Sequence, residues 1–321
     1  MFYLIRKETD PYFNLAAEEY LLKHGPGEMF MLWQNDPCVV IGKHQNAFAE
    51  VNVPLAVDHN IPVIRRISGG GAVYHDQGNV NFTFIADAEK GKQVDFLRFL
   101  KPLAEILKLS GLNVEIGRRN DLLTDGKKFS GNAEHVFKNR VIHHGTLLFD
   151  TNLDMLNTIL EAPVNKFQGK ALQSVRSVVT NLKPLLPEIN TIDEFIDKLL
   201  AGYLNNYPDS IEYQLSVIDR QNIEKLADER YRTDSWNFGY SPDFELKIDF
   251  KNQNINIKVT RGLISKIELS KTINKSYDDF FYKLTGLEFN YQIINQYITS
   301  NSSLFSLTET EIKQLIQSIF I

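Results

Sequence analysis

A run of three glycines, Gly69–Gly71, follows two arginines and precedes an apolar, strand-like segment. Glycine has no side chain and tolerates unusual backbone conformations, so such a run lets the main chain approach a ligand closely. Its free N–H groups, with the guanidinium groups of Arg65 and Arg66, would favour an anion such as a phosphate. The alternative is a hairpin turn with a flexible tip. The segment matches neither the P-loop nor the Rossmann pattern, because the glycine spacing differs and no Gly-Lys-Ser/Thr follows.

A lysine beside a predicted hairpin offers a further cation. Asp125 and Gly126 form a dipeptide that is a strong hairpin signal, and they predict a short strand on each side. If Phe129 faces the core, Lys128 and Ser130 share the opposite face of the second strand, because neighbouring side chains alternate. The residues that follow are small and polar, which leaves room for a ligand. The alternative is a lysine that is simply solvated, as most lysines are.

The two segments together form a cationic set that is rich in hydrogen-bond donors. Arg65, Arg66, the glycine run and Lys128 would stabilise the charge that develops on phosphorus during phosphoryl or nucleotidyl transfer. Signals for other chemistry do not stand out, since we find no Gly-x-Ser-x-Gly elbow and no carboxylate pair of the glycosidase type.

Histidines and aromatic residues near these segments are interpreted as structural. His75 is expected to be a hydrogen-bonded strand residue that orients the glycine loop. His143 and His144 are neighbours in a predicted strand, so their side chains point to opposite faces, which is poor geometry for shared chelation. Trp33 is assigned to the core, although a long acyl chain would need some apolar tunnel.

Short strands and amphipathic helices are expected to position these residues. Hydrophobic periodicity predicts helices at 14–24, 96–109, 153–160, 192–203 and 222–231. It predicts strands at 2–6, 29–33, 38–41, 61–66, 72–74, 81–85, 112–116, 121–123, 127–130 and 141–149. Residues 161–180 carry proline, glycine and several cations without periodicity, so we predict a long and mobile loop there.

Composition narrows the classes of protein. The chain has 321 residues and a net charge of −5, which argues against a nucleic-acid binder that relies on overall basicity. Its single cysteine, Cys38, excludes an internal disulfide and makes a cysteine-based zinc site implausible, and a reducing cytoplasm fits this. The N-terminus turns polar too soon for a signal peptide, and no apolar run approaches membrane-spanning length. We therefore expect a cytoplasmic protein without nucleic-acid or membrane partners.

The last eighty or so residues differ in character from the rest. Alternation of apolar and polar residues predicts half-exposed antiparallel strands at 243–250, 255–260 and 263–269, and helical patterns begin at 278, 291 and 308. We predict an α+β protein with a large domain, residues 1–242, in which mixed and antiparallel sheets are flanked by helices. Residues 243–321 would form a small α+β accessory domain.

Several motifs, in order along the chain, resemble those of the lipoate–protein ligases. They lie at residues 37–46, 66–79, 120–122, 128–133, 143–147 and 174–182, and include Arg66-x-Ser68-Gly69-Gly70-Gly71-Ala72-Val73-Tyr74-His75-Asp76 and Lys128-x-Ser130-Gly131-Asn132-Ala133. They cover residues 30 to 185 densely, and residues 236–239 look like the family's linker. The layout is similar to bacterial ligases with a C-terminal accessory domain. The resemblance implies a catalytic domain of the biotin/lipoyl ligase-like type.

The resemblance also implies a reaction and a set of site residues. Lipoate and MgATP would give lipoyl-AMP and pyrophosphate, and the lipoyl group would then pass to a lysine of an acceptor domain. Lys128 would be catalytic, placed between the lipoate carboxylate and the α-phosphate, and Gly70 and Gly71 would join it in binding lipoate. A loop of residues 160–179 would fold over the adenylate and exclude water. The implied contacts to ATP or lipoyl-AMP come from Arg66, Ser68, Gly69, Gly70, Gly71, Ala72, Val73, Tyr74, Asn79, Asp121 and Lys128.

The implied cofactors and partners follow from the same resemblance. ATP and Mg²⁺ would be required, with Asp121 near the Mg²⁺ and no structural metal site. The acceptors would be apo lipoyl domains of 2-oxo acid dehydrogenase E2 subunits, the glycine-cleavage H protein, or both.

Two other functions compete with ligation. Related octanoyl or lipoyl transferases use a cysteine nucleophile and no ATP, but Cys38 lies in a predicted buried strand, away from the position of their nucleophile. A lipoyl-AMP-binding regulatory module without catalysis is the third hypothesis, and no motif is visibly broken in the way that it would require.

Overall fold

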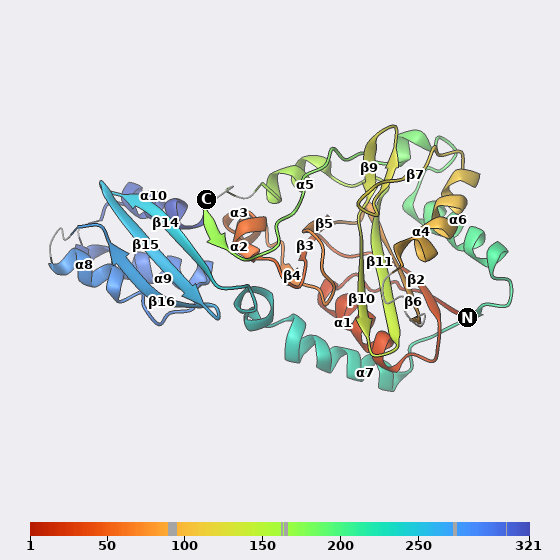
Figure 1. The fold of residues 1–321 in the computed structure, drawn as a ribbon, viewed down its shortest axis with the longest axis horizontal. Coiled ribbons are helices and arrows are strands. Elements are labelled where there is room, and N and C mark those ends of the chain that lie inside the picture. The colour runs from red at the N-terminus through yellow and green to blue at the C-terminus, as the bar shows by residue number, and fades with distance from the viewer. Residues whose placement is uncertain (89–94, 162, 164–165, 272–274, 306) are drawn as a thin grey trace.

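The larger part of the molecule is built around a six-stranded mixed sheet (Figure 1). The structure is a computed structural model that describes residues 1–88, 95–161, 163, 166–271, 275–305 and 307–321. The strand order is β10 (Asn132–Phe137), β11 (Arg140–Leu148), β6 (Asn79–Asp87), β2 (Met29–Trp33), β1 (Phe2–Ile5) and β13 (Ile211–Glu212). Strand β1 pairs in parallel with both β2 and β13, and the other pairs are antiparallel.

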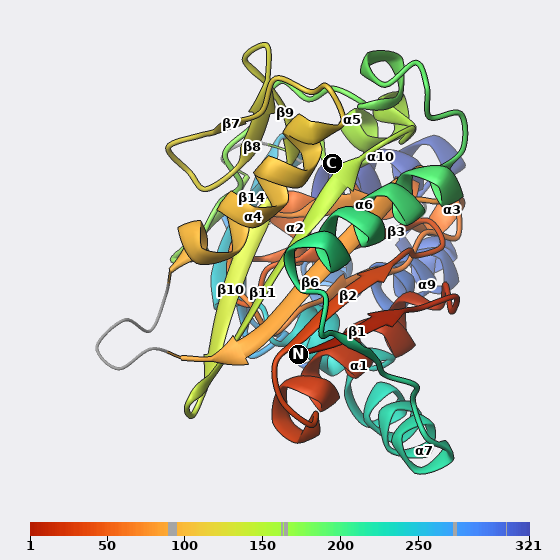
Figure 2. The same ribbon diagram turned by 90° about the vertical axis from the view of Figure 1, so that its right-hand side faces the viewer.

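Helices cover both faces of this sheet because its central strands are apolar on both sides. In β2, Phe30 and Leu32 face a core with α4 (Phe96–Leu109) and α6 (Ile192–Asn206), which lie over one face in Figure 2. The alternate residues of β2, such as Met31, face α1 (Pro11–His24) in a second core, to which α7 (Val217–Leu226) also contributes. A strand buried on both faces fixes the register of its neighbours strongly.

Two small sheets carry the predicted chemical segments. The first has the order β4 (Val63–Arg65), β3 (Cys38–Ile41) and β5 (Val73–His75), and the glycine run joins β4 to β5. The second consists of β7 (Glu115–Ile116), β8 (Leu122–Thr124) and β9 (Lys127–Ser130). The hairpin predicted between β8 and β9 is present, with positive φ at Asp125 (49°) and Gly126 (73°), as a tight primed turn requires.

The C-terminal part contains a second layered unit at the far end of the molecule from β10 and β11 (Figure 1). Strands β14 (Phe244–Phe250), β15 (Gln253–Thr260) and β16 (Leu263–Leu269) form an antiparallel sheet that packs against three helices. These helices are α8 (Lys275–Tyr282), α9 (Tyr291–Asn301) and α10 (Glu309–Phe320). The predicted α+β composition is confirmed.

A strand from the larger part joins the C-terminal sheet. Strand β12 (Phe167–Gly169) pairs with β14, and its Phe167 packs near Phe48 of α2 (Ala47–Glu50) and Phe244 in a shared apolar core. The boundary predicted at residue 243 stays a prediction, and the sequence pattern did not indicate this contact across it.

Several boundaries differ from the predictions for local reasons. Helix α1 begins at Pro11 rather than residue 14, since Asp10 caps it through the Tyr12 N–H. Helix α7 begins at Val217 rather than residue 222, because Ser216 forms a capping box. Strand β10 and the short helices α2 and α3 (Val53–Asp58) were not predicted, whereas α5 (Leu153–Ile159) was.

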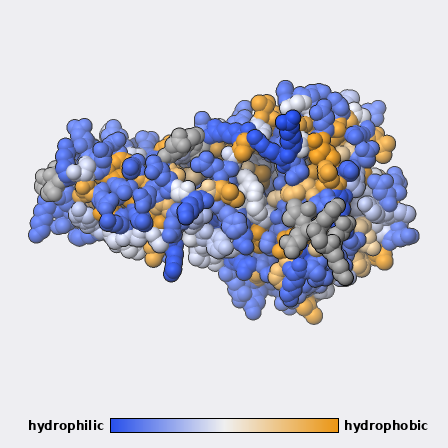
Figure 3. Space-filling view, viewed as in Figure 1, coloured by the Kyte–Doolittle hydropathy of each residue, from blue (hydrophilic) through white to orange (hydrophobic). Residues whose placement is uncertain are grey.

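The outer surface is mainly polar. Hydrophilic residues cover most of the face in Figure 3, with hydrophobic residues in small groups between them. No helix in the described part of the chain is long and apolar enough to cross a membrane.

Candidate active site

Two adjoining cavities lie beside the glycine run, with volumes of about 280 Å³ and 340 Å³. We call them the first and the second cavity. Their common wall places Lys128 at the junction, since its side chain lines both. The residues that line both cavities are Ala72, Val73, Lys128, Gly131, Thr146, Gln173, Ser174 and Val175.

The two cavities differ in their remaining walls. The first continues along Tyr74, Leu156 and Phe167 to the cationic side chain of Arg176. The second has an apolar wall of Trp33, Leu15, Val40 and Ala133, and polar and charged side chains line the rest of it. The apolar wall of the second cavity suits an acyl chain, and the charged groups of the same cavity suit a carboxylate at the end of that chain. The first cavity, beside the backbone after the glycine run, suits a second ligand with polar groups.

Arg66 holds the glycine turn in shape. Its Nη2 donates to the carbonyl oxygens of Gly69 (2.5 Å) and Gly71 (2.8 Å), and its Nε donates to Ser68 Oγ (3.0 Å). Gly70 has a φ of +87°, and a Cβ there would lie 2.9 Å from Nη2. Burial lowers the pKa of the Arg66 guanidinium to about 10, so it remains a cation at neutral pH. A rigid cation therefore lines the second cavity beside an ordered turn.

Arg65 does not belong to the site, contrary to the cationic set inferred from the sequence. Its guanidinium is fully buried and donates to backbone carbonyls of residues 42, 43 and 45 and of Trp236 and Asn237. It also donates to Ser241 Oγ (2.9 Å). Because successive side chains of a strand point in opposite directions, only one of the two arginines reaches the cavity.

Lys128 presents an unpaired ammonium group to both cavities. Among the described residues, none forms a hydrogen bond or ion pair with its Nζ, and a Cβ on Gly131 would lie only 3.1 Å from it. Burial lowers the pKa of Lys128, while Asp121 opposes this shift. A desolvated lysine without a counter-ion is costly unless an anionic ligand binds it, so this position marks a site for an anion.

A covering segment, residues 172–179, crosses the junction of the cavities. The Ser174 N–H donates to the carboxylate of Glu50 (3.1 Å), and Ser174 Oγ accepts from the Ala72 N–H (2.9 Å) and from Gln45 Nε2 (3.0 Å). Further along, backbone hydrogen bonds join Lys128 to residues 178 and 180. The predicted irregular loop is thus fixed at both ends of this segment, directly over the site.

His75 lines the second cavity and has one ring nitrogen bound to Asn35. Asn14 donates its side-chain amide to two backbone carbonyls and to Asn35 Oδ1, so the Asn35 Nδ2 faces His75 and donates to Nδ1 (3.1 Å). Burial and the nearby Arg66 lower the pKa of His75 to about 3, so the ring is neutral with its proton on Nε2. That nitrogen is buried, has no partner in the described part of the chain, and belongs to a residue lining the cavity.

The adjacent histidines of β11 face opposite sides, as the alternation predicted. His143 lies among phenylalanines on the far face and bonds to Glu134 through Nδ1 (2.9 Å). His144 lines the second cavity, as does Trp33, which the sequence analysis assigned to the core. Trp33 is only 2% exposed, so it serves as core and cavity wall together.

The predicted site residues separate into two groups. Those that line a cavity are Arg66, Gly70, Gly71, Ala72, Val73, Tyr74, Asp121 and Lys128. Ser68 and Gly69 line neither cavity and are instead hydrogen-bond partners of Arg66. Asn79 also lines neither cavity; it donates a hydrogen bond to Asn81, and Asn81 lines the second cavity. Lining residues that sequence reasoning missed include Glu18, Glu50 and Thr146. Glu18 could have been found as a carboxylate within the apolar run of α1.

The described residues provide neither a cluster of metal-holding side chains nor a reactive thiol at the site. In the described ranges, no group of three or more His, Cys, Asp and Glu side chains is placed to hold a metal ion. Cys38 is 0% exposed, and burial raises the pKa of its thiol, which disfavours the thiolate that a nucleophile needs.

Comparison with known proteins places this chain among the lipoyl ligases. A family model described as the lipoyl protein ligase A/B catalytic domain matches residues 10–204. Lipoate–protein ligase 1 of Staphylococcus aureus (strain Mu50) is 41% identical over 279 residues, which cover 85% of this chain and 83% of that protein. The chain therefore belongs to the lipoate–protein ligase family. The predicted enzyme class, ATP-dependent ligation of lipoate to protein, is confirmed by this membership.

Solved structures show the same catalytic fold. A lipoate-protein ligase A crystallised with bound ATP is 26% identical, has a TM-score of 0.64, and covers 74% of this chain and 99% of its own. A bipartite lipoate protein ligase of Thermoplasma acidophilum, analysed with its E2 lipoyl domain, is 28% identical with a TM-score of 0.65, covering 74% of this chain and 96% of its own.

Proposed function

We propose that the two cavities together hold lipoate and ATP and form lipoyl-AMP at Lys128. The observation that carries this proposal is the Lys128 ammonium, unpaired among the described residues, at the junction of the first and the second cavity. The lipoyl chain would occupy the second cavity and the nucleotide the first. Binding of ATP by a relative of the same fold supports this arrangement.

The first half-reaction follows from this placement. A lipoate carboxylate oxygen attacks the α-phosphorus of ATP, a carboxyl–phosphorus bond forms, and the bond to pyrophosphate breaks. Lys128 would neutralise the carboxylate and the α-phosphate while they approach and the charge that develops between them. Backbone N–H groups from Gly71 to Tyr74 would lie against the adenylate, and the Arg66 guanidinium, which lines the second cavity, would reach the acyl or phosphate oxygens.

Asp121 fits a role as a Mg²⁺ ligand. Mg²⁺ in nucleotide sites is commonly held by one or two carboxylates together with substrate phosphates. Asp121 lines the second cavity beside Lys128, and its buried Oδ1 lacks a hydrogen-bond partner among the described residues. When bound there, Mg²⁺ would offset the charge of the phosphates that leave.

The second half-reaction transfers the acyl group. A lysine amine of the acceptor attacks the acyl carbon, an amide forms, and AMP leaves with the electron pair of the broken bond. The covering segment would exclude water from the mixed anhydride meanwhile. We propose apo lipoyl domains of 2-oxo acid dehydrogenase E2 subunits or the glycine-cleavage H protein as acceptors in the cytoplasm, and the archaeal relative studied with its E2 lipoyl domain supports this choice.

Pyrophosphate exchange and protein mass spectrometry test the proposal. The purified protein with lipoate, Mg²⁺ and ATP should exchange labelled pyrophosphate into ATP and add a lipoyl mass to an apo lipoyl domain. Lys128→Ala should lose both activities, whereas Lys127→Ala, which removes an exposed lysine at the hairpin tip, should keep them. Equal activity in both variants would contradict the assignment of Lys128.

The same assay separates the two competing functions. A cysteine transferase would modify the acceptor without ATP and lose activity in Cys38→Ser. A regulatory module would bind lipoyl-AMP without modifying any acceptor. The burial of Cys38 argues against the first.

A further inference from the structure

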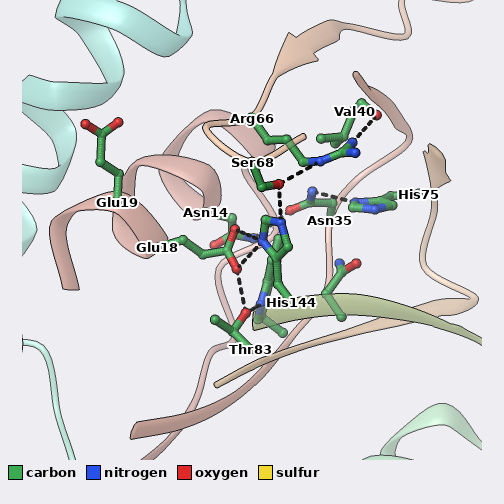
Figure 4. A network of polar contacts seen from close by, with 12 residues as sticks. Asn14, Glu18, Glu19, Asn35, Val40, Arg66, Ser68, His75, Thr83 and His144 are labelled. Carbon is green, nitrogen blue, oxygen red and sulfur yellow. Dashed lines mark hydrogen bonds and ion pairs between the residues drawn. The ribbon is translucent and has the colours of Figure 1, made fainter. Parts of the chain in front are cut away.

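A chain of hydrogen bonds connects the glycine-turn arginine to a buried carboxylate on α1 (Figure 4). Arg66 Nε lies 3.0 Å from Ser68 Oγ, and Ser68 Oγ lies 2.6 Å from His144 Nε2. His144 Nδ1 in turn lies 3.0 Å from both carboxylate oxygens of Glu18. We call these four residues the arginine relay. They come from α1, β11 and the turn after β4, so only the fold brings them together.

The chemistry of the end groups fixes the direction of the first and the last hydrogen bond. A guanidinium only donates, so Arg66 donates to Ser68, and the Ser68 hydroxyl can give its own proton to His144 Nε2. An ionised carboxylate only accepts, so His144 donates from Nδ1 to Glu18. Glu18 Oε1 also accepts from Thr83 Oγ1 (2.5 Å). A continuous chain of hydrogen bonds therefore runs from the buried Arg66 guanidinium through Ser68 and His144 to the buried Glu18 carboxylate.

The arginine relay supplies the counter-charge that Arg66 otherwise lacks. Arg66 is 6% exposed and Glu18 2% exposed, and no carboxylate in the described ranges contacts the guanidinium directly. A buried cation needs compensation by charge and by hydrogen bonds to remain ionised. Ser68 and His144 bridge the gap between the two charges and orient the intervening dipoles.

The relay also decides which part of Arg66 faces the ligand. Four of the five N–H groups of the Arg66 guanidinium donate hydrogen bonds within the protein. The Nε–H donates to Ser68, the two Nη2–H groups donate to the carbonyl oxygens of Gly69 and Gly71, and one Nη1–H donates to the Val40 carbonyl oxygen (3.1 Å). One Nη1 group is left without a partner in the described residues. His144 lines the second cavity, yet both of its ring nitrogens are occupied within the relay, so it offers the ligand no hydrogen bond.

We propose that His144 and Ser68 are positioning residues for adenylate formation, which act through Arg66. They hold the guanidinium charged, and they aim its single free N–H and the glycine-turn backbone at the reacting carboxylate and phosphate. Glu18 is the carboxylate end of the arginine relay. This inference rests on the proposed function, because it concerns the same adenylation step.

The adjacent His143 provides a matched control. It is also buried and also bonds through Nδ1 to a buried glutamate, Glu134 (2.9 Å), but on the opposite face of β11 and away from Arg66. Both histidines belong to β11, and losing either one breaks a buried His–Glu pair. A merely structural role for His144 therefore predicts similar effects of His144→Leu and His143→Leu on activity per folded molecule.

Steady-state pyrophosphate exchange separates these outcomes. We expect Ser68→Ala and His144→Leu to lower kcat about 10- to 100-fold, as expected for losing a hydrogen bond to a charged group, with little change in KM for lipoate or ATP. His144→Gln, which keeps an acceptor for the Ser68 hydroxyl, should recover part of the loss. His143→Leu should keep kcat near that of the unaltered protein, with folded fraction measured by circular dichroism. Equal loss in the two leucine variants would overturn the proposal.

A double-mutant cycle tests whether the effect passes through Arg66. In an Arg66→Lys background the relay has lost its end group, so adding Ser68→Ala should cost little more. Losses that multiply independently would overturn the proposal even if each single variant is slow. Absence of exchange in the unaltered protein would instead contradict the proposed function, and the two failures are thus distinct.

Discussion

Arg65 and Arg66 are neighbours in the chain, yet their guanidinium groups belong to two separate hydrogen-bond networks. Arg66 organises the glycine turn at the cavities, whereas Arg65 ties the loop after β3 to the segment that leads into the C-terminal sheet. We therefore predict that Arg66 serves the reaction, whereas Arg65 stabilises the fold where the chain leads into the C-terminal sheet.

Arg65→Met should act on stability. The substitution leaves several buried carbonyl oxygens without donors, and losing such a network costs roughly 3 kcal/mol or more of unfolding free energy. Urea denaturation should show a lower midpoint, and activity per folded molecule should change less than in Arg66→Met. A large loss of turnover in folded Arg65→Met would contradict its exclusion from the site.

Gly70→Ala should distort the glycine turn. The φ of +87° is strained for alanine by about 1–2 kcal/mol, and the added Cβ would lie 2.9 Å from Arg66 Nη2. We expect slower pyrophosphate exchange by at least about tenfold, in line with a displaced cation. Gly69→Ala is the matched control, since a Cβ there meets nothing within 4 Å. A normal rate in Gly70→Ala would show that the turn tolerates a side chain.

Lys128→Met should separate stability from activity. Burial lowers the pKa of Lys128 in the folded protein, so the unfolded chain binds this proton more tightly and stability rises as pH increases from the lowered pKa toward 10.5. Removing the ammonium should therefore leave the protein at least as stable at neutral pH, and stability should then rise less with pH. The rate of adenylation should fall by at least about 100-fold. Thermal unfolding from pH 7 to 10 measures the first effect. A clear loss of stability at pH 7 would mean that Lys128 has an unseen partner.

The site could be predicted from the sequence where local chemistry determines it. The turn at Asp125 and Gly126 requires positive φ at two positions, and that requirement is visible in the residue types. The glycine run likewise indicates close approach of a backbone. Residue types alone therefore predict that these two segments approach a ligand, and Lys128 belongs to the second of them.

The relay and the role of Arg65 depend on distant partners and could not be predicted. Glu18 and His144 are 126 positions apart in the sequence, and only the fold brings their side chains into hydrogen-bond contact. Arg65 meets Asn237 across 172 positions. Which of two adjacent arginines faces a ligand depends on the strand's orientation in the sheet, which residue types alone do not encode.

Ser174→Ala should make the enzyme lose its intermediate to water. Ser174 Oγ accepts hydrogen bonds from the Ala72 N–H and from Gln45, and these fasten the covering segment across the cavities. Without the hydroxyl the segment should open more often, and water should reach the acyl-adenylate.

The expected signature of the Ser174→Ala variant is uncoupling of the two half-reactions. AMP should form faster than acceptor protein is modified, by at least a few-fold, whereas the unaltered enzyme should release about one AMP per lipoyl group transferred. Ser177→Ala is the control, because Ser177 is exposed on the same segment and forms no hydrogen bond to another described residue. Tight coupling in Ser174→Ala would show that the segment stays closed through its backbone pairing with Lys128 alone.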